Sequence, residues 1–312
     1  MEVRLGPHLF VFPGTQLTEV GKWCKIDKNC GEGIGLAQYR ILMTSDIHCT
    51  DLEDWYGVSD HDRMEHWLEA VHREHEKQPF DLILIPGDIS LDYHAEKTPF
   101  DKGYSTAWQF MKMYAARLPK GVPVIVGAGN HEQFPEETWH KITGNPRQCH
   151  AVVGNHTFVM LDGFREALLT TYDSSDCYST MDTAYIRQLL DKYPENHMWL
   201  VSHWFQPEAE TEEFRRLVSS ESRIRGLFMG HTHEHQLIPL GPEWGNKVIA
   251  QTGNFSYTMS GADTGGFWGF RDLVIEENKA VSRYIMADSD VVLEEGRVHF
   301  DGRLSQILEY TL

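Results

Sequence analysis

The sequence is poor in cysteine and in long apolar runs. Five cysteines stand among 312 residues, an odd number at irregular spacing, so neither a disulfide framework nor a zinc-finger pattern is expected. No run approaches the roughly 18 apolar residues of a membrane helix. The first eight residues also lack the apolar core of a secretory signal. We therefore expect no membrane span and a reducing compartment, which favours a cytoplasmic location.

Basic residues are also scarce. There are 28 of them against 46 acidic residues, which gives a net charge of −18. This excess opposes binding of an extended nucleic-acid backbone, so nucleic acid is not an expected partner. A bound metal cation would still create a local positive site, and a small anionic substrate remains compatible with the charge.

No internal repeat, low-complexity tract or linker divides the chain, and 312 residues suffice for one large domain. We therefore expect a single domain over 1–312. Its parts would be an N-terminal wrap at 1–39, a metal-site core at 40–235 and a β-rich segment at 236–312. The alternative is that this last segment forms a separate unit.

What the sequence does contain is a set of apolar runs that end in residues able to bind metals. One run ends in Gly230-His231-Thr232-His233, where a bend after a strand can aim two imidazoles into one cleft. A surface turn would explain this short motif on its own. The other runs end in Asp46-Ile47-His48, Gly87-Asp88, Gly129-Asn130-His131-Glu132 and His203. Because ligands bind at the carboxyl ends of strands in open α/β sheets, these runs together predict one shared site.

The spacing of apolar residues between these runs predicts the remaining elements. Helices are expected over 60–78, 105–117, 183–193 and 212–219. The first three strands then follow a β-α-β-α-β order, which implies parallel pairing with right-handed crossovers. Short strands are expected at 149–153, 157–161, 236–240, 247–251, 268–275 and 280–287, with a final pair at 291–294 and 297–300. The sequence therefore predicts an α/β (α+β) protein with two packed sheets.

Some histidine and cysteine patterns are interpreted as structural. Gly154-Asn155-His156 repeats the Gly-Asn-His motif but lies between two β-rich runs, so we predict a hairpin turn in which Gly and Asn are left-handed. Four histidines within 60–78 are assigned to a solvated helix face, because no strand end focuses them. Cys49, next to His48, is either a reactive thiol or a thiol packed beneath the site.

The strand-end residues combine carboxylates, an amide and imidazoles without a thiolate. Such ligands suit Mn, Fe, Zn, Co or Ni. The set comprises Asp46, His48, Asp88, Asn130, His131, His203, His231 and His233. One metal does not take so many ligands, whereas two metals roughly 3.5 to 4 Å apart, bridged by a carboxylate and a water, would use them. Such a pair lowers the pKa of the bridging water and clamps phosphoryl oxygens, which predicts hydrolysis of phosphoesters.

The five motifs, in this order, resemble those of the calcineurin-like metallophosphoesterases. That family pattern is Asp-x-His, Gly-Asp, Gly-Asn-His-Asp/Glu, a single His and Gly-His-x-His, and the chain matches it between residues 46 and 233. The joint occurrence is specific, although each motif alone is weak. The resemblance implies a four-layer α/β/β/α double β-sandwich with mixed sheets, flanked by helices.

The resemblance also implies roles for single residues. One metal would be held by Asp46, His48, Asp88 and His233. The second would be held by Asp88, Asn130, His203 and His231, with Asp88 bridging the two. His131 matches the family histidine that contacts the phosphate and assists the leaving group as a general acid, and Glu132 would orient or tune it. Thr232 would point away from both metals.

Departures from two branches of the family narrow the subtype. The residues after Asp88 lack the Asp-Arg-Gly of the protein serine/threonine phosphatases, and Asp46-x-His48 differs from the Asp-x-Gly of purple acid phosphatases. Tyr93 lies two places beyond the metal-binding tyrosine of that second branch, so we interpret it as a pocket or packing residue. The remainder resembles the bacterial phosphodiesterase and phosphomonoesterase branch. Trp204 and Phe205 either line the substrate pocket or pack in the core.

The sequence therefore predicts a hydrolase that cleaves phosphomonoester or phosphodiester bonds of a small molecule through a hydroxide bridging two metals. A nucleotide or a lipid head group would be a suitable substrate. One alternative is a metal-dependent nuclease, which would need a basic groove that the composition does not indicate. Another is a non-catalytic scaffold that binds a protein partner. Loss of ligands would favour the scaffold, and this chain keeps all of them.

Overall fold

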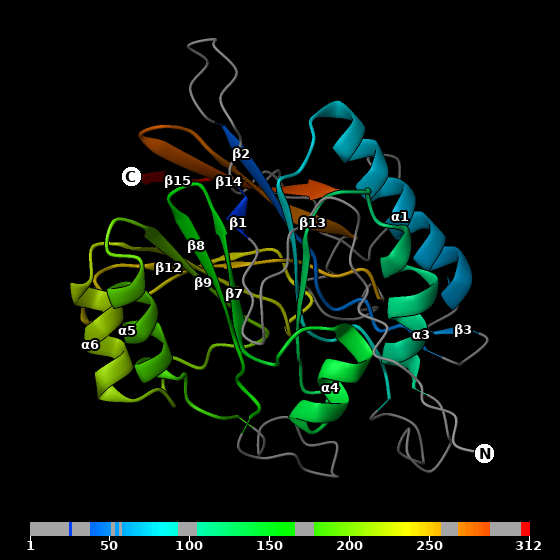
Figure 1. Cartoon of the computed structure of the whole chain (residues 1–312), viewed down its shortest axis with the longest axis horizontal. Coiled ribbons are helices and arrows are strands. Elements are labelled where there is room, and N and C mark those ends of the chain that lie inside the picture. Colours follow the sequence, from blue (N-terminus) through cyan, green and yellow to red (C-terminus); the bar gives the residue numbers. More distant parts are fainter. Residues whose placement is uncertain are drawn as a thin grey trace, which may run out of the picture.

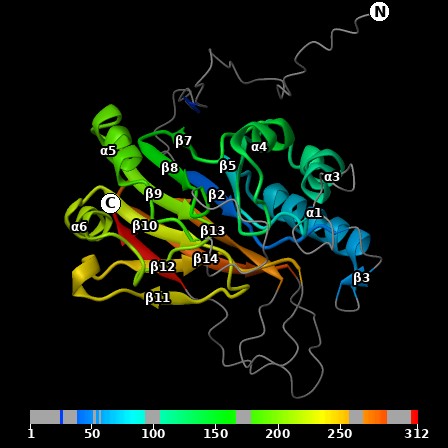
Figure 2. The ribbon, with the colours of Figure 1, turned by 90° about the horizontal axis from the view of Figure 1, so that it is seen from below.

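Two large mixed sheets pack face to face, and helices cover both outer faces of the pair (Figure 2). This computed structural model describes residues 25–26, 38–50, 54–55, 58–92, 105–165, 178–256, 268–287 and 307–312. The arrangement confirms the predicted four-layer fold class. Tyr93, most of the expected N-terminal wrap and the expected hairpin at 291–300 lie outside the described residues.

The first sheet has seven strands in the order β1-β7-β8-β9-β10-β12-β11. Their bounds are Lys25–Ile26 (β1), Cys149–Val153 (β7), His156–Leu161 (β8), His197–Ser202 (β9), Ile224–Met229 (β10), Leu237–Pro239 (β11) and Val248–Gln251 (β12). Strands β8, β9, β10 and β12 run parallel. The carboxyl ends of β9 and β10 therefore share one edge, where the chain continues into His203 and His231.

The second sheet has six strands in the order β15-β14-β13-β2-β5-β6. Their bounds are Tyr39–Met43 (β2), Leu82–Pro86 (β5), Val124–Gly127 (β6), Gly269–Ile275 (β13), Lys279–Met286 (β14) and Leu308–Thr311 (β15). Strands β2, β5 and β6 are parallel, as predicted, and β13 pairs antiparallel with β2. The strands after residue 236 thus complete both sheets, β11 and β12 joining the first and β13 to β15 the second. A short hairpin, β3 (Asp54–Trp55) with β4 (Val58–Ser59), precedes the first helix.

Helices flank the two sheets on opposite sides (Figures 1 and 2). Those beside the second sheet are α1 (Asp60–Lys77), α3 (Thr106–Met113) and α4 (Glu136–Thr143), and those beside the first are α5 (Thr183–Lys192) and α6 (Glu212–Ser220). Single turns of 3-10 helix occur at Ala115–Arg117 (η1) and Pro242–Trp244 (η3). The side chain of Asp182 accepts a hydrogen bond from the N–H of Tyr185, so it caps α5. In the described part of the chain, every helix is too short or too polar to cross a membrane.

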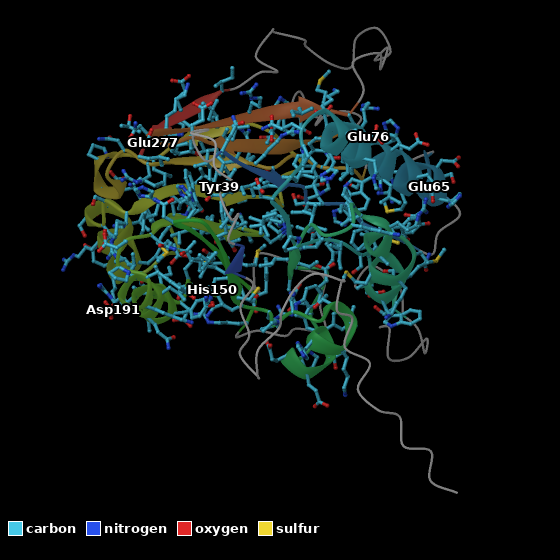
Figure 3. All side chains as sticks on the ribbon, turned by 45° about the horizontal axis from the view of Figure 1, so that its top comes forward. Tyr39, Glu65, Glu76, His150, Asp191 and Glu277 are labelled. Carbon is cyan, nitrogen blue, oxygen red and sulfur yellow. The ribbon has the colours of Figure 1, made fainter. Side chains whose placement is uncertain are left out.

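Three apolar layers fill the spaces between the layers of secondary structure. Because side chains alternate along a strand, β2 sends Ile41 and Met43 between the sheets and Leu42 toward α1. On β9, Trp199 lies between the sheets and Leu200 faces α5 and α6. Both faces of these strands are buried, which explains their unbroken apolar sequences. Acidic side chains such as those of Glu76 and Asp191 lie at the periphery instead (Figure 3).

The repeated Gly-Asn-His tripeptide forms the hairpin between β7 and β8, as predicted. Gly154 is left-handed with φ of 58°, but Asn155 is not, so that part of the prediction was wrong. His156 is buried and accepts a hydrogen bond from Nε1 of Trp199 at 3.2 Å. Its position in the sheet core keeps it away from the strand ends that carry the candidate ligands.

The histidines of α1 are not uniformly solvated. His61 is exposed, whereas His66, His72 and His75 are half-buried. His72 contacts the carbonyl of Arg117 at 2.8 Å, and His75 accepts a hydrogen bond from the N–H of Phe80. The prediction of a polar face therefore holds only for His61. His66 packs against the rings of Phe255 and Trp268, and even His61 has its Nδ1 3.4 Å from the hydroxyl of Tyr114.

Candidate metal centre

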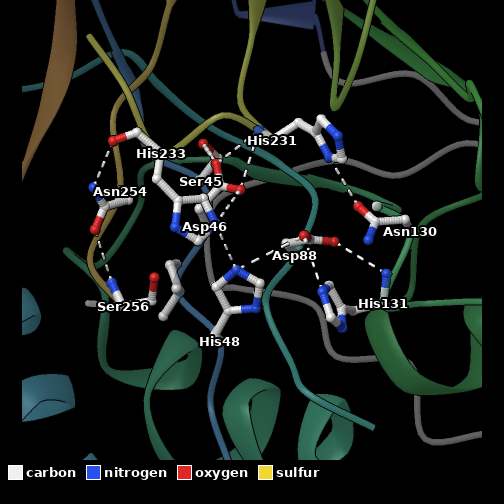
Figure 4. Close-up of polar contacts among 12 residues, drawn as sticks. Ser45, Asp46, His48, Asp88, Asn130, His131, His231, His233, Asn254 and Ser256 are labelled. Atoms are coloured by element: carbon white, nitrogen blue, oxygen red, sulfur yellow. Dashed lines mark hydrogen bonds and ion pairs between the residues drawn. The ribbon is translucent and has the colours of Figure 1, made fainter. Parts of the chain in front are cut away.

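The predicted strand-end residues come together at one edge of the two sheets (Figure 4). The ligand atoms of their acidic and histidine side chains form three groups, and within each group they lie within 4.8 Å of one another. The groups are Asp46, His48 and His233; Asp88, His203 and His231; and His48, Asp88 and His131. The parallel pairing of β2, β5 and β6 aligns the carboxyl ends of one sheet, and that of β9 and β10 aligns those of the other. The packing of the two sheets then brings both sets of ends together.

The two histidines of the Gly-His-x-His motif lie in different groups. Nε2 of His233 lies 3.1 Å from Nε2 of His48. Nδ1 of His231 instead lies 3.0 Å from Oδ1 of Asn130. Thr232 between them is exposed, and its hydroxyl accepts a hydrogen bond of 2.6 Å from a glutamine of β12. Although only Thr232 lies between them in the sequence, the imidazoles of His231 and His233 thus lie in two neighbouring clusters.

Asp88 is the carboxylate that lies nearest the middle of the site. Its Oδ2 lies 3.1 Å from Nε2 of His203, and 3.7 Å from Nε2 of both His48 and His131. Burial favours a raised pKa for this carboxyl, but His203, His131 and His48 outweigh it and hold the pKa well below its usual range. Asp88 is therefore an ionised group that faces imidazoles from each of the three clusters.

Asp46 is oriented by its neighbours on both sides. The hydroxyl of Ser45 donates to its Oδ2 at 2.5 Å, and the N–H of His231 lies 3.0 Å from both carboxylate oxygens. Burial raises the pKa of Asp46 to about 7, and Asp88 adds to this effect. The position of this carboxylate thus depends on the loop that carries His231.

His203 has one nitrogen anchored and the other presented to the site. Its Nδ1 lies 2.9 Å from the carbonyl of Pro86, so this nitrogen carries a proton and donates it. Its Nε2 lies 3.0 Å from Oδ1 of Asn130 and 3.1 Å from Oδ2 of Asp88. Burial favours a lower pKa for His203, yet Asp88, Asp46 and Glu132 together raise the pKa to about 9. The surroundings of His203 therefore favour a positive charge.

Five site residues have left-handed backbone conformations. Their φ values are 52° for Asp46, 49° for His48, 50° for Asp88, 71° for His231 and 61° for His233. In residues other than glycine such strain costs about 1–3 kcal/mol each, and it persists only where the surrounding structure enforces it. The strain therefore lies in the loops that supply the candidate ligands.

Two glycines of the motifs are required by close approach of a carboxylate. A Cβ atom at Gly129 would overlap Oδ1 of Asp88, and one at Gly230 would overlap Oδ2 of Asp46 and Oγ of Ser45. Both contacts cross from one strand-end loop to another. The glycines of Gly-Asn-His and Gly-His-x-His thus allow the loops to pack around the two buried carboxylates.

Replacing Gly230 by alanine is therefore expected to displace the carboxylate of Asp46. We expect metal affinity to fall about 10- to 100-fold, the range for loss of support around a metal ligand. Isothermal titration with Mn²⁺ measures this change. Gly121→Ala is the control, because Gly121 is also left-handed but has nothing within 4 Å of its added Cβ. Equal losses in the two variants would contradict the role of the close approach.

Glu132 ties two of the loops together through their backbones. Its Oε2 accepts from the N–H of Asp88 at 2.8 Å and of Gly129 at 2.9 Å, and its Oε1 accepts from the N–H of Ser90 at 3.0 Å. Burial raises the pKa of Glu132 to about 8, and Asp88 adds to it. The family resemblance implies that Glu132 orients or tunes His131, which stays a prediction. Its hydrogen bonds to the backbone show that Glu132 also holds the loops after β5 and β6 together.

The aromatic residues after His203 differ in their surroundings. The ring of Trp204 stacks on His231 with centroids 4.1 Å apart and is partly exposed. Phe205 is buried and stacks with Phe214 in the core between the first sheet and its helices. Of the two interpretations, core packing fits Phe205, and a place beside the site fits Trp204.

Cys49 is packed beneath the site. It is fully buried, with its Sγ 3.7 Å from Oδ2 of Asp60. Burial raises the pKa of this thiol well above its usual value, and Asp60 raises it further. Because the thiolate is the reactive form, the structure favours the packing interpretation.

The residues present fit a pair of divalent cations. Carboxylate oxygens, an amide oxygen and imidazole nitrogens converge, and acceptor atoms such as Oδ1 of Asn130 and Oδ2 of Asp88 both face Nε2 of His203. Acceptor atoms this close together repel one another unless a proton or a cation lies between them. Oxygen and imidazole donors without a thiolate suit Mn, Fe, Zn, Co or Ni.

The fold and this site define a metal-dependent phosphoesterase, and comparison with known proteins gives the family. The family model described as calcineurin-like phosphoesterase matches residues 39–235. The chain belongs to the calcineurin-like phosphoesterase family, which confirms the resemblance seen in the sequence. The match covers all five strand-end motifs.

Solved structures share the fold at low sequence identity. A dimetal phosphatase from Danio rerio is 12% identical, with 88% of this chain and 98% of that chain covered and a TM-score of 0.61. The purple acid phosphatase PPD1 from yellow lupin seeds is 11% identical, with 86% and 54% covered and a TM-score of 0.53. GAP50 of Plasmodium, an anchor in the inner membrane complex, is 10% identical, with 84% and 91% covered and a TM-score of 0.51. At these identities the likeness extends to the fold alone.

Proposed function

We propose that the protein hydrolyses phosphomonoester or phosphodiester bonds of a small molecule with a dinuclear metal centre. The proposed first position comprises Asp46, His48, Asp88 and His233. The proposed second position comprises Asp88, Asn130, His203 and His231. The observation that carries this proposal is the place of Asp88, whose Oδ2 faces His48 of one set and His203 of the other. A carboxylate so placed is suited to bridge two cations.

When bound, two such cations would lower the pKa of water and neutralise phosphoryl oxygens, leaving the protein to supply orientation and a proton. His131 is proposed as the proton donor to the leaving group. Its backbone N–H donates to Oδ1 of Asp88 at 3.1 Å, and its Nε2 lies 3.7 Å from Oδ2. Asp88 thereby positions the imidazole beside the site, where a leaving oxygen can take a proton from it. Trp204, stacked on His231, is proposed as one wall of the substrate pocket.

Removal and return of metal tests this function. We expect a chelator to abolish hydrolysis and lower Tm, because Asp46 and Asp88 would stay buried without a cation between them. Reloading with Mn²⁺, Fe²⁺, Zn²⁺, Co²⁺ or Ni²⁺ should restore activity on some member of a panel of phosphomonoesters, cyclic nucleotides and glycerophosphodiesters. Metal analysis should give two ions per chain. Fewer than two ions after Mn²⁺ loading would reject the dinuclear centre.

The two alternatives make different predictions for the same samples. A nuclease would cleave DNA or RNA, and its activity would fall strongly as the salt concentration rises. The net charge of −18 opposes the binding of nucleic acid. A scaffold would bind metal yet hydrolyse nothing in the panel. The presence of His131 and all proposed ligands favours the enzyme over the scaffold.

A further inference from the structure

Two buried arginines lie next to the loops of the candidate metal centre, and each is paired with an aspartate. Arg63 of α1 and Arg147, which precedes β7, are 1% and 4% exposed. Arg63 binds Oδ1 of Asp60 at 2.6 Å, and Arg147 binds both carboxylate oxygens of Asp162 at 2.6 and 3.1 Å. A buried ion pair contributes little net stability, because both charges lose their hydration. The ion pairs alone therefore do not explain why these arginines are buried. The hydrogen bonds made by their remaining N–H groups do.

Arg63 directs those donors to backbone carbonyls of the loop after β2. Its Nη2 donates to the carbonyl of His48 at 2.9 Å, and its Nη1 donates to the carbonyl of Ile47 and, at 2.9 Å, to that of Phe255. Asp60 extends this contact by accepting from the N–H of Thr50 at 3.1 Å. Because His48 is left-handed, its carbonyl does not continue the strand ladder and needs another donor. The guanidinium supplies it.

Through Phe255, Arg63 is also connected to the loop that supports His233. The N–H of Phe255 donates to the carbonyl of Asp46 at 3.1 Å, and the side chain of Asn254 donates to the carbonyl of His233 at 2.7 Å (Figure 4 shows this last bond). Arg63 is thus joined directly to the backbone of His48, through Phe255 to that of Asp46, and through Phe255 and Asn254 to that of His233. These are the three residues of the first cluster.

Arg147 makes the equivalent contact with the loop after β6. Its Nη1 donates to the carbonyls of Glu132 at 2.7 Å and Phe134 at 3.0 Å. Glu132 in turn holds the N–H of Gly129, so this contact fixes the loop from which Asn130 projects. The bonds of Arg147 go to a loop distinct from the two that Arg63 binds.

We propose that the two arginines are positioning residues with separate targets: Arg63 sets the Asp46, His48 and His233 position, and Arg147 sets the Asn130 side of the second position. This inference rests on the proposed ligand sets. Each guanidinium holds its loop through a planar fork of donors that a lysine ammonium does not reproduce. The two arginines therefore bind different loops, although Glu132, which Arg147 binds, also holds the N–H of Asp88, a residue of both proposed positions.

The test compares Arg63→Lys with Arg147→Lys, which serve as controls for each other because both remove a buried guanidinium and keep the charge. Full-length protein is titrated with Mn²⁺ by calorimetry. Anomalous scattering from crystals loaded with about one equivalent of Mn²⁺ reports which position fills first. We expect Arg63→Lys to weaken the first position about 10- to 100-fold and Arg147→Lys to weaken the second by a similar factor. The other position should change much less in each variant.

Equal weakening of both positions in either variant would overturn the inference, as would unchanged affinities. Circular dichroism and Tm of the metal-free variants report folding. A lysine variant that loses the native spectrum would also overturn it, because the arginine would then serve the fold as a whole. Wild-type protein that binds fewer than two Mn²⁺ ions would reject the proposed function itself. Two ions in the wild type with no separation between the variants would reject only the separate roles of the arginines.

Discussion

Asp88→Asn is expected to lower kcat/KM by at least about 10³-fold and to reduce bound metal below two ions per chain. The amide keeps the size of the side chain but removes the charge that faces His48, His131 and His203. A loss of about 4 kcal/mol in transition-state stabilisation corresponds to that factor, and removal of a bridging charge from a two-metal site is of this order. Steady-state kinetics and metal analysis on the same sample measure both effects.

Asp92→Asn provides the matched control for Asp88. Asp92 is also buried, but its carboxylate accepts from the N–H groups of Thr106 and Ala107 at the start of α3. We expect that variant to lose about 0.5–2 kcal/mol of stability, as for a lost helix cap, and to keep two metals. If Asp88→Asn retained two tightly bound ions and near-normal kcat/KM, the bridging role would be wrong.

His131→Gln is expected to lower kcat about 10²- to 10⁴-fold on an alkyl phosphoester, the range for loss of a general acid. On an aryl ester with a good leaving group the loss should be small, because little protonation is needed. Metal content should stay at two ions per chain. His131 also shares a cluster with His48 and Asp88, so loss of an ion would instead make it a ligand.

His150→Gln is the control for loss of a buried histidine. His150 lies on β7 between the hydroxyls of Tyr185 and Tyr193, away from the strand ends of the site. We expect this variant to be less stable but to keep its kcat on both esters. A similar drop on the alkyl and aryl esters in His131→Gln would argue against proton donation and for a role in substrate binding.

The strand-end pattern predicted both the fold and the convergence of the candidate ligands. The strands involved are buried on both faces, so their sequences are unbroken apolar runs, and each run ends where a polar residue enters the site. Parallel pairing brings those ends together within each sheet, and the face-to-face packing of the two sheets then brings both sets to one site. The separation of His231 from His233 was also expected from the motif. The three clusters are consistent with that expectation.

Other features could not be predicted because they depend on contacts distant in sequence. Helix α4 has only eight residues and only Trp139 is buried, with Ile142 packed beside it, so its sequence gives too short a helical pattern to predict it. Strand β15 pairs with β14 at the sheet edge and has little apolar sequence of its own. Arg63 and Arg147 resemble surface arginines in the sequence, and only the folded chain shows them bonded to loop carbonyls. Phe205 and Trp204 are neighbours whose different burial follows from the direction of the loop after β9.

The proposed ligands are divided between the two sheets. Asp46, Asp88 and Asn130 follow strands of the second sheet, whereas His203 and His231 follow strands of the first. A cation at either proposed position would therefore cross-link the sheets across their shared edge. Metal binding would then require docked sheets, and metal release would loosen that docking. The centre would thus govern how slowly the protein unfolds as well as what it hydrolyses.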